Sequence, residues 1–428
     1  MTARARRFTY VGLEIAGDTA IARYALDERR FEETVRFEGT GTLESPGVVA
    51  ALELWFLIAG LSYYKAGAAH EIHLGPTGVG QAGRRLLDAA LLDGLGEYAF
   101  RNSLDLSDVE ITGGRDVAPQ SVSTDATSLL TPFGGGIDSV VTVHELSDEL
   151  DQSLFIVSPT SGTFAPLEST AALTGRRVVR VARQIDPAIL AGDPAFLNGH
   201  VPVTAMITLL AVAAALAGSR GGVAMSNEHS ASVPNMVVRG RDVNHQWSKS
   251  WVAEQLVAAA VAERVGDEFV VASVLRSRSE LWVAERFSHL ETYHRTFRSC
   301  NRAFAQASER RATTWCGECD KCLFIHLVLA PFMDRSALAA VLGVEPLADP
   351  ARLEQLRTLV GLSAQRKPFE CVGDPTECAV ALRTLATRPE WRDVSNVSAL
   401  AALLERDETL DELLEPQGAS RVPAAWLR

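Results

Sequence analysis

The fold of this chain is decided by the stretch Pro132-Phe133-Gly134-Gly135-Gly136-Ile137-Asp138-Ser139-Val140-Val141. An apolar run typical of a buried strand leads into it, and a helical pattern follows it. Three consecutive glycines allow a tight turn and a close approach of the backbone to a bulky anion. The N–H groups at the start of the following helix favour phosphate, and Ser139 adds a hydroxyl group. The stretch therefore predicts a phosphate-binding turn. Asp138 caps the helix or helps to hold a magnesium ion on a nucleotide, and a plain glycine turn is the alternative.

The residues around and after this turn alternate between two patterns. Short apolar runs typical of buried strands lie at Ser128–Phe133, Leu154–Val157, Arg177–Val181 and Gly222–Met225. Helical patterns lie between them at Ser139–Leu150, Glu168–Leu173 and Val203–Ala217. This alternation predicts an α/β fold with a doubly wound parallel sheet, which binds ligands at the carboxyl ends of its strands.

Two flanking regions have different patterns. Residues 1–120 are predicted to form a mixed α/β N-terminal domain, with strands at Phe8–Ile15, Thr19–Leu26 and Phe31–Phe37 and a helix at Pro46–Leu61. The stretch Gly113–Ser128, rich in Gly, Asp, Ser and Thr, marks the boundary. Residues 125–335 are the predicted catalytic domain. Residues 336–428 are predicted to be helical, with helices at Ser336–Val344, Ala351–Leu362 and Val397–Leu414.

The composition is that of an ordinary globular protein. Of 428 residues, 47% are hydrophobic and 22% are charged, which excludes intrinsic disorder. Lys and Arg number 41 against 53 Asp and Glu, so the net charge is −12. An acidic chain has no global field that attracts nucleic acid, so no nucleic-acid partner is expected. We interpret the local basic runs, Arg4–Arg7 and Arg295–Arg311, as solvated faces.

The sequence also favours one cellular location. Glu14 and Asp18 interrupt what would be the apolar core of a signal peptide. The uncharged stretch Val201–Ala217 is shorter than a usual membrane span, so we predict a buried helix and no span. Six Cys in an untargeted chain indicate a reducing compartment. We therefore expect a cytoplasmic protein.

A cluster of cysteines is predicted to bind metal. It consists of a CxxCxxC run and one Cys sixteen positions before it: Cys300, Cys316, Cys319 and Cys322. Four thiolates satisfy a tetrahedral structural zinc, and Gly317 permits the turn that aims N–H groups at sulfur. An iron–sulfur cluster and metal-free thiols that act as acid and base are the alternatives. Cys371 is predicted to be a small buried hydrophobe and Cys378 a helix residue, and neither is expected to be a ligand.

Two polar segments lie between the glycine turn and the cysteines: Ser226-Asn227-Glu228-His229-Ser230-Ala231-Ser232 and Asn244-His245-Gln246-Trp247-Ser248-Lys249-Ser250. The first follows the last predicted strand, so it should lie at the ligand-binding edge. The second begins an amphipathic helix whose apolar side, with Trp251, Val252 and Leu256, is expected to face a core.

The side chains of these segments suit a substrate-binding site. Lys249 suits an anionic carboxylate or phosphate, and His229 and His245 titrate in the range useful for proton transfer. The alternatives are helix capping by Asn244 and turn chemistry by Asn227. Earlier in the chain, Tyr64 and Lys65 can stack on and pair with a substrate; an aromatic core with one surface lysine is the alternative there.

The glycine turn resembles the SGGxDS pyrophosphate loop of the ATP-pyrophosphatase (PP-loop) superfamily, with Gly134 in place of the usual Ser. The resemblance implies a sheet of the PP-loop type and ATP cleaved between its α and β phosphates. It implies that ATP is bound by Gly134, Gly135, Gly136, Ile137, Asp138 and Ser139, with Ser158 near the adenosine. The cysteine cluster is similar to the one in deazaguanine synthases, which are also PP-loop enzymes.

Further segments, in order along most of the chain, resemble a narrower family. They are Ser62–Ala66, Phe133–Ser139, Ser226–Glu228, Asn244–Ser250, Cys316–Cys322, Leu329–Phe332 and Lys367–Cys371. The family is that of the ATP-dependent UDP-N-acetylmuramoyl-L-alanyl-L-glutamate epimerases of peptidoglycan synthesis. The resemblance implies that UDP-MurNAc-L-Ala-L-Glu, ATP and water give the D-Glu epimer, AMP and diphosphate.

The chemistry of that reaction suggests roles for the candidate residues. We expect catalytic roles for His229, His245, Lys249 and Asp138, with a cysteine as another candidate for proton transfer. We expect the substrate to contact Tyr64, Lys65, Asn227, Glu228, Asn244 and Lys249. Magnesium is expected to neutralise the leaving diphosphate. The alternatives are another adenylating PP-loop enzyme, either deazaguanine synthase-like or tRNA-modifying, and a non-catalytic nucleotide- or zinc-binding protein.

Overall fold

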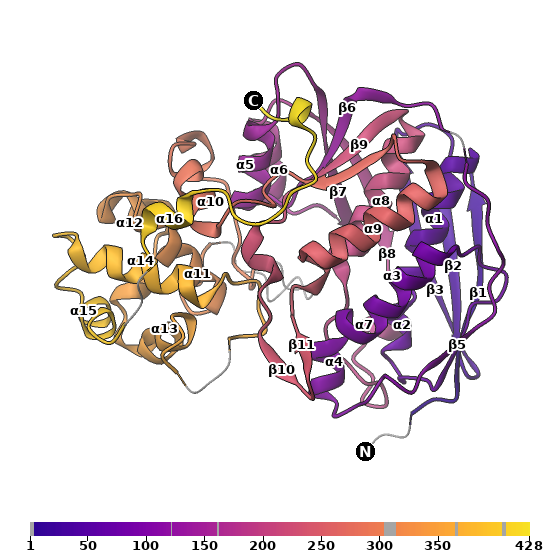
Figure 1. Cartoon of the computed structure of the whole chain (residues 1–428), viewed down its shortest axis with the longest axis horizontal. Coiled ribbons are helices and arrows are strands. Elements are labelled where there is room, and N and C mark those ends of the chain that lie inside the picture. The colour runs from indigo at the N-terminus through magenta and orange to yellow at the C-terminus, as the bar shows by residue number, and fades with distance from the viewer. Residues whose placement is uncertain (1–3, 121, 161, 304–313, 364–366, 405–407) are drawn as a thin grey trace.

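The computed structural model describes residues 4–120, 122–160, 162–303, 314–363, 367–404 and 408–428. One large sheet runs through the right of Figure 1, and the C-terminal helices gather at the left. The sheet has ten strands in the order β12-β9-β6-β7-β8-β3-β2-β1-β4-β5. Their bounds are β1 Arg7–Ala16, β2 Thr19–Leu26, β3 Arg29–Glu38, β4 Glu71–His73, β5 Glu110–Thr112, β6 Asp125–Pro132, β7 Asp151–Pro159, β8 Arg177–Gln184, β9 Arg220–Met225 and β12 Val270–Ser273. A separate two-stranded sheet pairs β10 (Met236–Val238) with β11 (Arg241–Val243).

The helices fall into two groups along the chain. Those of the first 290 residues are α1 Pro46–Ala59, α2 Leu61–Tyr64, α3 Gln81–Ala89, α4 Gly96–Arg101, α5 Ile137–Glu145, α6 Ala165–Leu173, α7 Pro187–Leu190, α8 Val203–Ala217, α9 Trp251–Val265 and α10 Glu280–Ser288. The later ones are α11 Asp320–Leu329, α12 Arg335–Leu342, α13 Leu353–Leu359, α14 Pro375–Thr387, α15 Ser395–Ala401 and α16 Leu410–Leu414. Short helical turns that matter for the site are η2 His229–Ser232 and η3 Trp247–Lys249.

The parallel half of the sheet is doubly wound, as the sequence predicts. Its strands lie in the order β8-β7-β6-β9-β12, and every neighbouring pair is parallel. Numbered from one to five along the chain, these strands lie in the order 3-2-1-4-5. The winding direction therefore reverses between β6, the first, and β9, the fourth. Side chains alternate between the faces. Leu130 and Phe155 lie in the core with α8 and α9, whereas Leu129 and Leu154 lie in the core with α5 and α10.

The N-terminal strands extend the same sheet. The antiparallel β1-β2-β3 meander joins the parallel half through β3 and β8, which pair antiparallel. The junction holds a buried ion pair: Arg183 Nε lies 2.7 Å from Glu33 Oε1, and the Tyr63 hydroxyl donates to Glu33 Oε2 at 2.8 Å. The predicted parts 1–120 and 125–335 therefore share one sheet.

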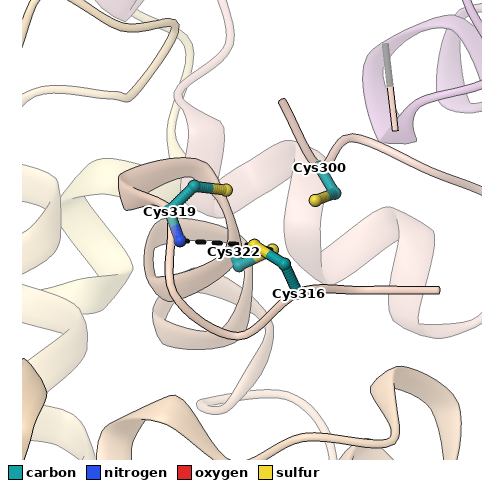
Figure 2. Close-up of side chains that lie close together, drawn as sticks. All are labelled: Cys300, Cys316, Cys319 and Cys322. Atoms are coloured by element: carbon teal, nitrogen blue, oxygen red, sulfur yellow. Dashed lines mark hydrogen bonds between the residues drawn. The ribbon is translucent and has the colours of Figure 1, made fainter. Parts of the chain in front are cut away.

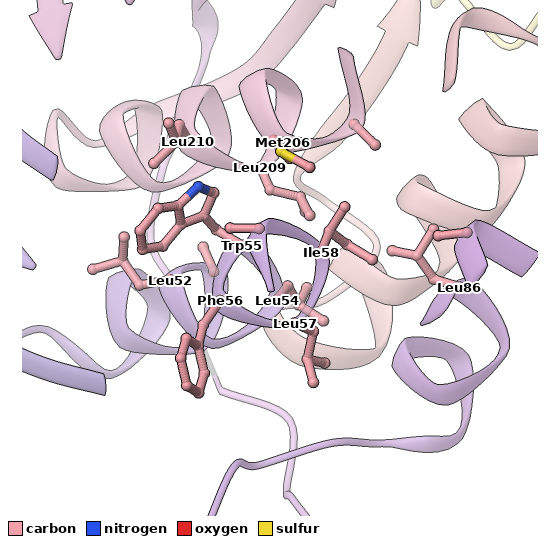
Figure 3. Close-up of a cluster of buried hydrophobic side chains, with 14 of the residues drawn as sticks. Leu52, Leu54, Trp55, Phe56, Leu57, Ile58, Leu86, Met206, Leu209 and Leu210 are labelled. Atoms are coloured by element: carbon pink, nitrogen blue, oxygen red, sulfur yellow. The ribbon is translucent and has the colours of Figure 1, made fainter. Parts of the chain in front are cut away.

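Helix α1 forms the centre of the larger core. Its residues are apolar on nearly every side, and all but Pro46 and Val49 are buried. Figure 3 shows Trp55 and its neighbours packed against Met206, Leu209 and Leu210 of α8. The stretch Pro46–Tyr64 is long and apolar enough to cross a membrane, but nearly all of it is buried inside the protein. The predicted buried helix at 203–217 is confirmed as α8.

Two details of the sequence prediction are wrong. Val252 of α9 is 55% exposed, because the buried side of this helix is formed by Ala253, Val257, Ala260 and Val261. The predicted helix 397–414 begins with α15 and ends with α16, which are separate helices. Residues 405–407 between them lie outside the described residues.

Candidate active site

A cavity of about 530 Å³ lies at the carboxyl ends of β6, β7 and β9. Its volume falls in the range typical of small-molecule sites. The lining includes most of the predicted phosphate-binding turn (Gly134, Gly136, Ile137, Asp138 and Ser139), together with Ser158, Asn227 and Lys249. The chain runs from β6 and from β9 into helices that lie on opposite faces of the sheet. A crevice is therefore expected between the ends of these two strands.

The glycine turn has the backbone geometry that its sequence predicts. Gly135 has a φ of +72°, in the left-handed region that favours glycine. Its N–H donates to Ser139 Oγ at 3.1 Å, and that hydroxyl donates to the Gly136 carbonyl at 3.1 Å. A Cβ at Gly135 would lie 3.1 Å from Leu167 Cδ1, whereas a Cβ at Gly134 would meet no atom within 4 Å. The turn is therefore tight at Gly135 and open at Gly134.

Three cations line the cavity: Lys249, Lys321 and Arg298. Burial tends to lower the pKa of Lys249, but the charges of Cys371, Glu228 and Asp138 outweigh it and raise this pKa. Arg298 belongs to the basic run that the sequence analysis interprets as a solvated face, and the structure places it in the cavity lining instead. Residues 304–311 of that run lie outside the described residues.

Three carboxylates meet beside these cations. One oxygen from each of Asp138, Glu228 and Glu280 lies within 4.8 Å of the other two. Asp138 Oδ1, Glu228 Oε2 and Glu280 Oε2 are buried and have no hydrogen-bond partner among the described residues. Burial and the charge of Glu228 raise the pKa of Asp138 to about 6. The arrangement can accept a cation, because oxygen ligands of this kind are those that magnesium prefers.

A buried arginine fixes the backbone of the two polar segments. Arg276, which is 1% exposed, donates to the carbonyl of Glu228 at 2.8 Å and to that of Lys249 at 2.6 Å. Its charge is paired with Glu254 at 2.8 Å. Glu228 and Lys249 are therefore held together although twenty-one positions separate them in the sequence.

The structure brings the four predicted metal ligands together (Figure 2). The sulfur atoms of Cys300, Cys316, Cys319 and Cys322 all lie within 4.8 Å of one another, and none is in a disulfide. The N–H groups of Glu318 and Cys319 both point at Cys316 Sγ at 3.4 Å, around Gly317 with its φ of +69°. Tetrahedral zinc needs sulfurs about 3.8 Å apart, so the four thiols fit that ion.

His245 lies behind the cavity in a chain of hydrogen bonds. Its Nδ1 lies 2.5 Å from Glu97 Oε2, and the imidazole also interacts with the Cys371 thiol. The ring of His200 lies 4.1 Å from that of His245, centroid to centroid. Although burial opposes it, the bonds to Cys371 and Glu97 raise the pKa of His245 to about 9. The pKa of His200 is lowered to about 4 by burial and by the charge of His245.

The remaining predicted residues lie outside the cavity lining. His229 packs against Gly418, and burial lowers its pKa. Asn244 shapes a turn by donating to the Ala231 carbonyl and accepting from the Gln246 N–H. Tyr64 is in the core, where its hydroxyl donates to the Ala69 carbonyl, and Lys65 donates to Asn198 Oδ1 at 2.9 Å. For Tyr64 the structure matches the alternative, a core aromatic. Asn244 does not cap the helix as its alternative predicts, because Ser250 is the cap of α9.

Sequence reasoning missed several residues of the site. Cys371 lines the cavity and is only partly buried, in contrast to the predicted buried hydrophobe, whereas Cys378 is a helix residue of α14 as predicted. Glu97, Glu280 and Lys321 were not singled out. No local pattern marks Glu97 or Glu280, because each reaches its partners only through the tertiary fold. Lys321 could have been found from its place inside the CxxCxxC run.

The fold and cavity define the class of this protein: an α/β protein with a small-molecule site at the switch point of its sheet. Models of the MurL N-terminal domain and the MurL C-terminal domain match residues 1–274 and 296–414. Three curated relatives are named UDP-N-acetyl-alpha-D-muramoyl-L-alanyl-L-glutamate epimerase. They come from Salinispora tropica (39% identical, covering 92% of this chain and 87% of the relative), Micromonospora sp. (37%, 98% and 96%) and Xanthomonas oryzae pv. oryzae (33%, 99% and 96%). The chain therefore belongs to the MurL family. No solved structure matches it.

The raised pKa of His245 predicts a pH dependence of stability. A group whose pKa is higher in the folded state stabilises the fold below its unfolded value of about 6.5 and loses this effect as the pH rises. We expect the difference in free energy of unfolding between the wild type and His245→Gln to fall between pH 6.5 and 9, by about 3 kcal/mol at most. Urea denaturation across this range measures it. His289→Gln, at an exposed histidine, is the control, and a difference that grows with pH would contradict the assignment.

Proposed function

We propose that the protein is an ATP-dependent epimerase. It inverts the terminal L-Glu of UDP-MurNAc-L-Ala-L-Glu to D-Glu through an acyl-adenylate and releases AMP and diphosphate. The names of the MurL relatives support the substrate and the inversion. The observation that carries the ATP step is the cavity itself, which is lined by the glycine turn and three cations; Asp138 of its lining also belongs to the group of three carboxylates. The product serves peptidoglycan synthesis, and the location proposed is the cytoplasm.

The need for ATP follows from the chemistry of the carbon next to a carboxylate. Removing its proton while the carboxylate is ionised puts two negative charges on adjacent groups. Adenylation removes one of these charges, and the carbonyl oxygen then accepts the other as an enolate. Water finally releases AMP from the inverted carboxyl group. The cations Lys249, Lys321 and Arg298 line the cavity, and their positive charges favour the anionic partners at each stage.

The ATP phosphates are assigned to the turn Gly134–Ser139. Its tight backbone at Gly135 presents N–H groups at the start of α5, where the helix dipole also favours an anion. Strand order and turn together support a sheet of the PP-loop type. The open space beside Gly134 is compatible with the missing serine, because nothing fills the volume where a side chain would lie.

The donor set fits the expected magnesium ion. Asp138, Glu228 and Glu280 would hold it through the three oxygens that lack partners among the described residues. When bound, this ion supplies positive charge against the diphosphate leaving group. Asp138 belongs to both the turn and the carboxylate group, so it connects the nucleotide to the cation.

The cysteine cluster fits a structural zinc that supports the cavity. Cys300 follows Arg298, and Lys321 lies between Cys319 and Cys322. Linking Cys300 to the CxxCxxC run therefore holds Arg298 and Lys321, two of the three cations that line the cavity, in place. The Arg298 N–H donates to the Gly135 carbonyl at 3.2 Å, so this segment also contacts the glycine turn.

The decisive test is incubation with ATP, magnesium and UDP-MurNAc-L-Ala-L-Glu. We expect D-Glu in the product by chiral analysis, and AMP and diphosphate that depend on this substrate. Release of diphosphate with tRNA instead would favour another adenylating PP-loop enzyme. ATP binding without AMP formation with any candidate substrate would favour a non-catalytic nucleotide-binding protein.

The two glycines of the turn give a matched pair of variants for ATP binding. Gly135→Ala forces an alanine into the left-handed region against Leu167, at a cost of about 1 kcal/mol or more that displaces the turn. We expect it to weaken ATP affinity about tenfold in calorimetry with magnesium present. Gly134→Ala, which meets no atom, should bind ATP as the wild type does. Equal affinities of the two variants would contradict the assignment.

The zinc assignment is tested by metal analysis of the purified protein. We expect about one zinc per chain, lost in Cys316→Ser and retained in Cys378→Ala. Loss of the metal should also weaken ATP binding, because Arg298 and Lys321 lose their support. Iron with acid-labile sulfide would favour an iron–sulfur cluster, and a metal-free protein with full ATP affinity would favour free thiols.

A further inference from the structure

Cys371 lies on a segment that is held against the cavity by amide side chains. Asn235 Nδ2 donates to the Pro368 carbonyl at 2.7 Å, and Gln246 Nε2 donates to the Val372 carbonyl at 3.0 Å. Asn301, which also lines the cavity, donates through Nδ2 to Glu370 Oε2 at 2.5 Å. The segment that carries the thiol is therefore held by hydrogen bonds before and after Cys371 in the sequence, and Cys371 lines the same cavity as the glycine turn.

The groups behind this thiol form a Cys–His–Glu chain. Cys371 and His245 interact closely enough that each shifts the pKa of the other, and His245 Nδ1 lies 2.5 Å from Glu97 Oε2. Glu97 is 5% exposed and is also paired with Arg101 at 2.5 Å. A nucleophile or base, a histidine, and a carboxylate that orients the histidine are the arrangement by which enzymes activate thiols.

The charges around Cys371 favour its thiolate. Burial tends to raise the pKa of the thiol, but Lys249, the hydrogen bond from His245 and Lys321 outweigh it and lower the pKa to about 7. A pKa near the working pH is the one that suits a general base. By contrast, Cys378 is fully buried away from the cavity, and burial raises its pKa.

We propose that the Cys371 thiolate is the base that removes the α-proton of the glutamyl residue, with His245 and Glu97 as positioning residues. This inference rests on the proposed function, which brings the activated carboxyl group into the same cavity. His245 lies outside the cavity lining, so it acts through the thiol and does not contact the substrate.

The proton balance closes with water as the second partner. The Cα–H bond breaks, its proton passes to Sγ, and its electron pair moves into the enolate of the activated carboxyl group. Water in the cavity then protonates Cα on the opposite face and becomes hydroxide. The hydroxide takes the proton from the thiol, which regenerates water and the thiolate. Nothing is oxidised or reduced, and Lys249 and Lys321 offset the charge of the enolate.

The test separates proton transfer from adenylation. The full-length protein is incubated in deuterium oxide with ATP, magnesium and UDP-MurNAc-L-Ala-L-Glu, and deuterium at Cα and diphosphate release are followed together. We expect Cys371→Ala to lower deuterium incorporation about 10²- to 10⁴-fold, the usual contribution of a general base, while diphosphate release changes far less. Cys378→Ala, the matched buried cysteine, should retain both.

Each outcome decides the proposal. Undiminished incorporation of deuterium in Cys371→Ala overturns it and leaves the ATP step intact. Absence of diphosphate release in the wild type refutes adenylation, and the role of Cys371 is then judged on the exchange alone. Should Cys371→Ala fail to fold, alkylation of the wild type by iodoacetamide replaces it: loss of exchange, prevented by substrate, supports the proposal, and full exchange by alkylated protein overturns it.

The positioning role has its own readout. In Glu97→Gln the imidazolium loses its anionic partner, so the thiolate is less favoured. We expect the pH at which exchange is half-maximal to move upward, with the rate largely recovered at high pH. A merely structural role of Glu97 would lower the rate equally at all pH values and would leave the midpoint in place.

Discussion

The reversal of winding between β6 and β9 is the constraint on which the rest of the structure depends. Helices α5 and α6 cover one face of the parallel half, and α8 and α9 cover the other. The connections that leave β6 and β9 therefore diverge, and the space between them cannot be filled by either helix layer. The glycine turn after β6 and the polar segment after β9 face this space from its two sides. A ligand-binding crevice is thus a consequence of strand order, before any side chain is chosen.

The charges of the site come from segments that are far apart in the chain. Asp138, Glu228 and Glu280 meet as carboxylates, while Lys249 and Lys321 offset them. Such a concentration of buried charge costs stability unless the groups are paired or share a cation. Buried Arg276, held by Glu254, fixes two of these segments through their carbonyls. The site is therefore prepared for charged ligands at the expense of the stability of the ligand-free protein.

Local physics decided what the sequence could predict. The glycine turn, the parallel strands and α8 follow from short-range patterns of glycine and apolar residues, and all appear in the structure. The spacing of the cysteines likewise predicted that Cys300 would join the CxxCxxC run. The exposed Val252 shows where periodicity fails, because a helix with alanines on several sides has no unique apolar face. Glu97, His245 and Cys371 come together from three distant segments, so no single stretch of sequence could reveal their chain of hydrogen bonds.

The central claim is that ATP activates the glutamyl carboxylate in this cavity. It is tested most directly with a substrate whose glutamyl α-carboxylate carries ¹⁸O, followed by mass spectrometry of the AMP formed during turnover. An acyl-adenylate that water opens at the carbonyl carbon leaves one carboxylate oxygen on phosphorus, so AMP should contain one ¹⁸O atom. AMP that carries no label while the glutamate is inverted would contradict the account, because an acyl-adenylate opened by water at its carbonyl carbon must leave a carboxylate oxygen on AMP.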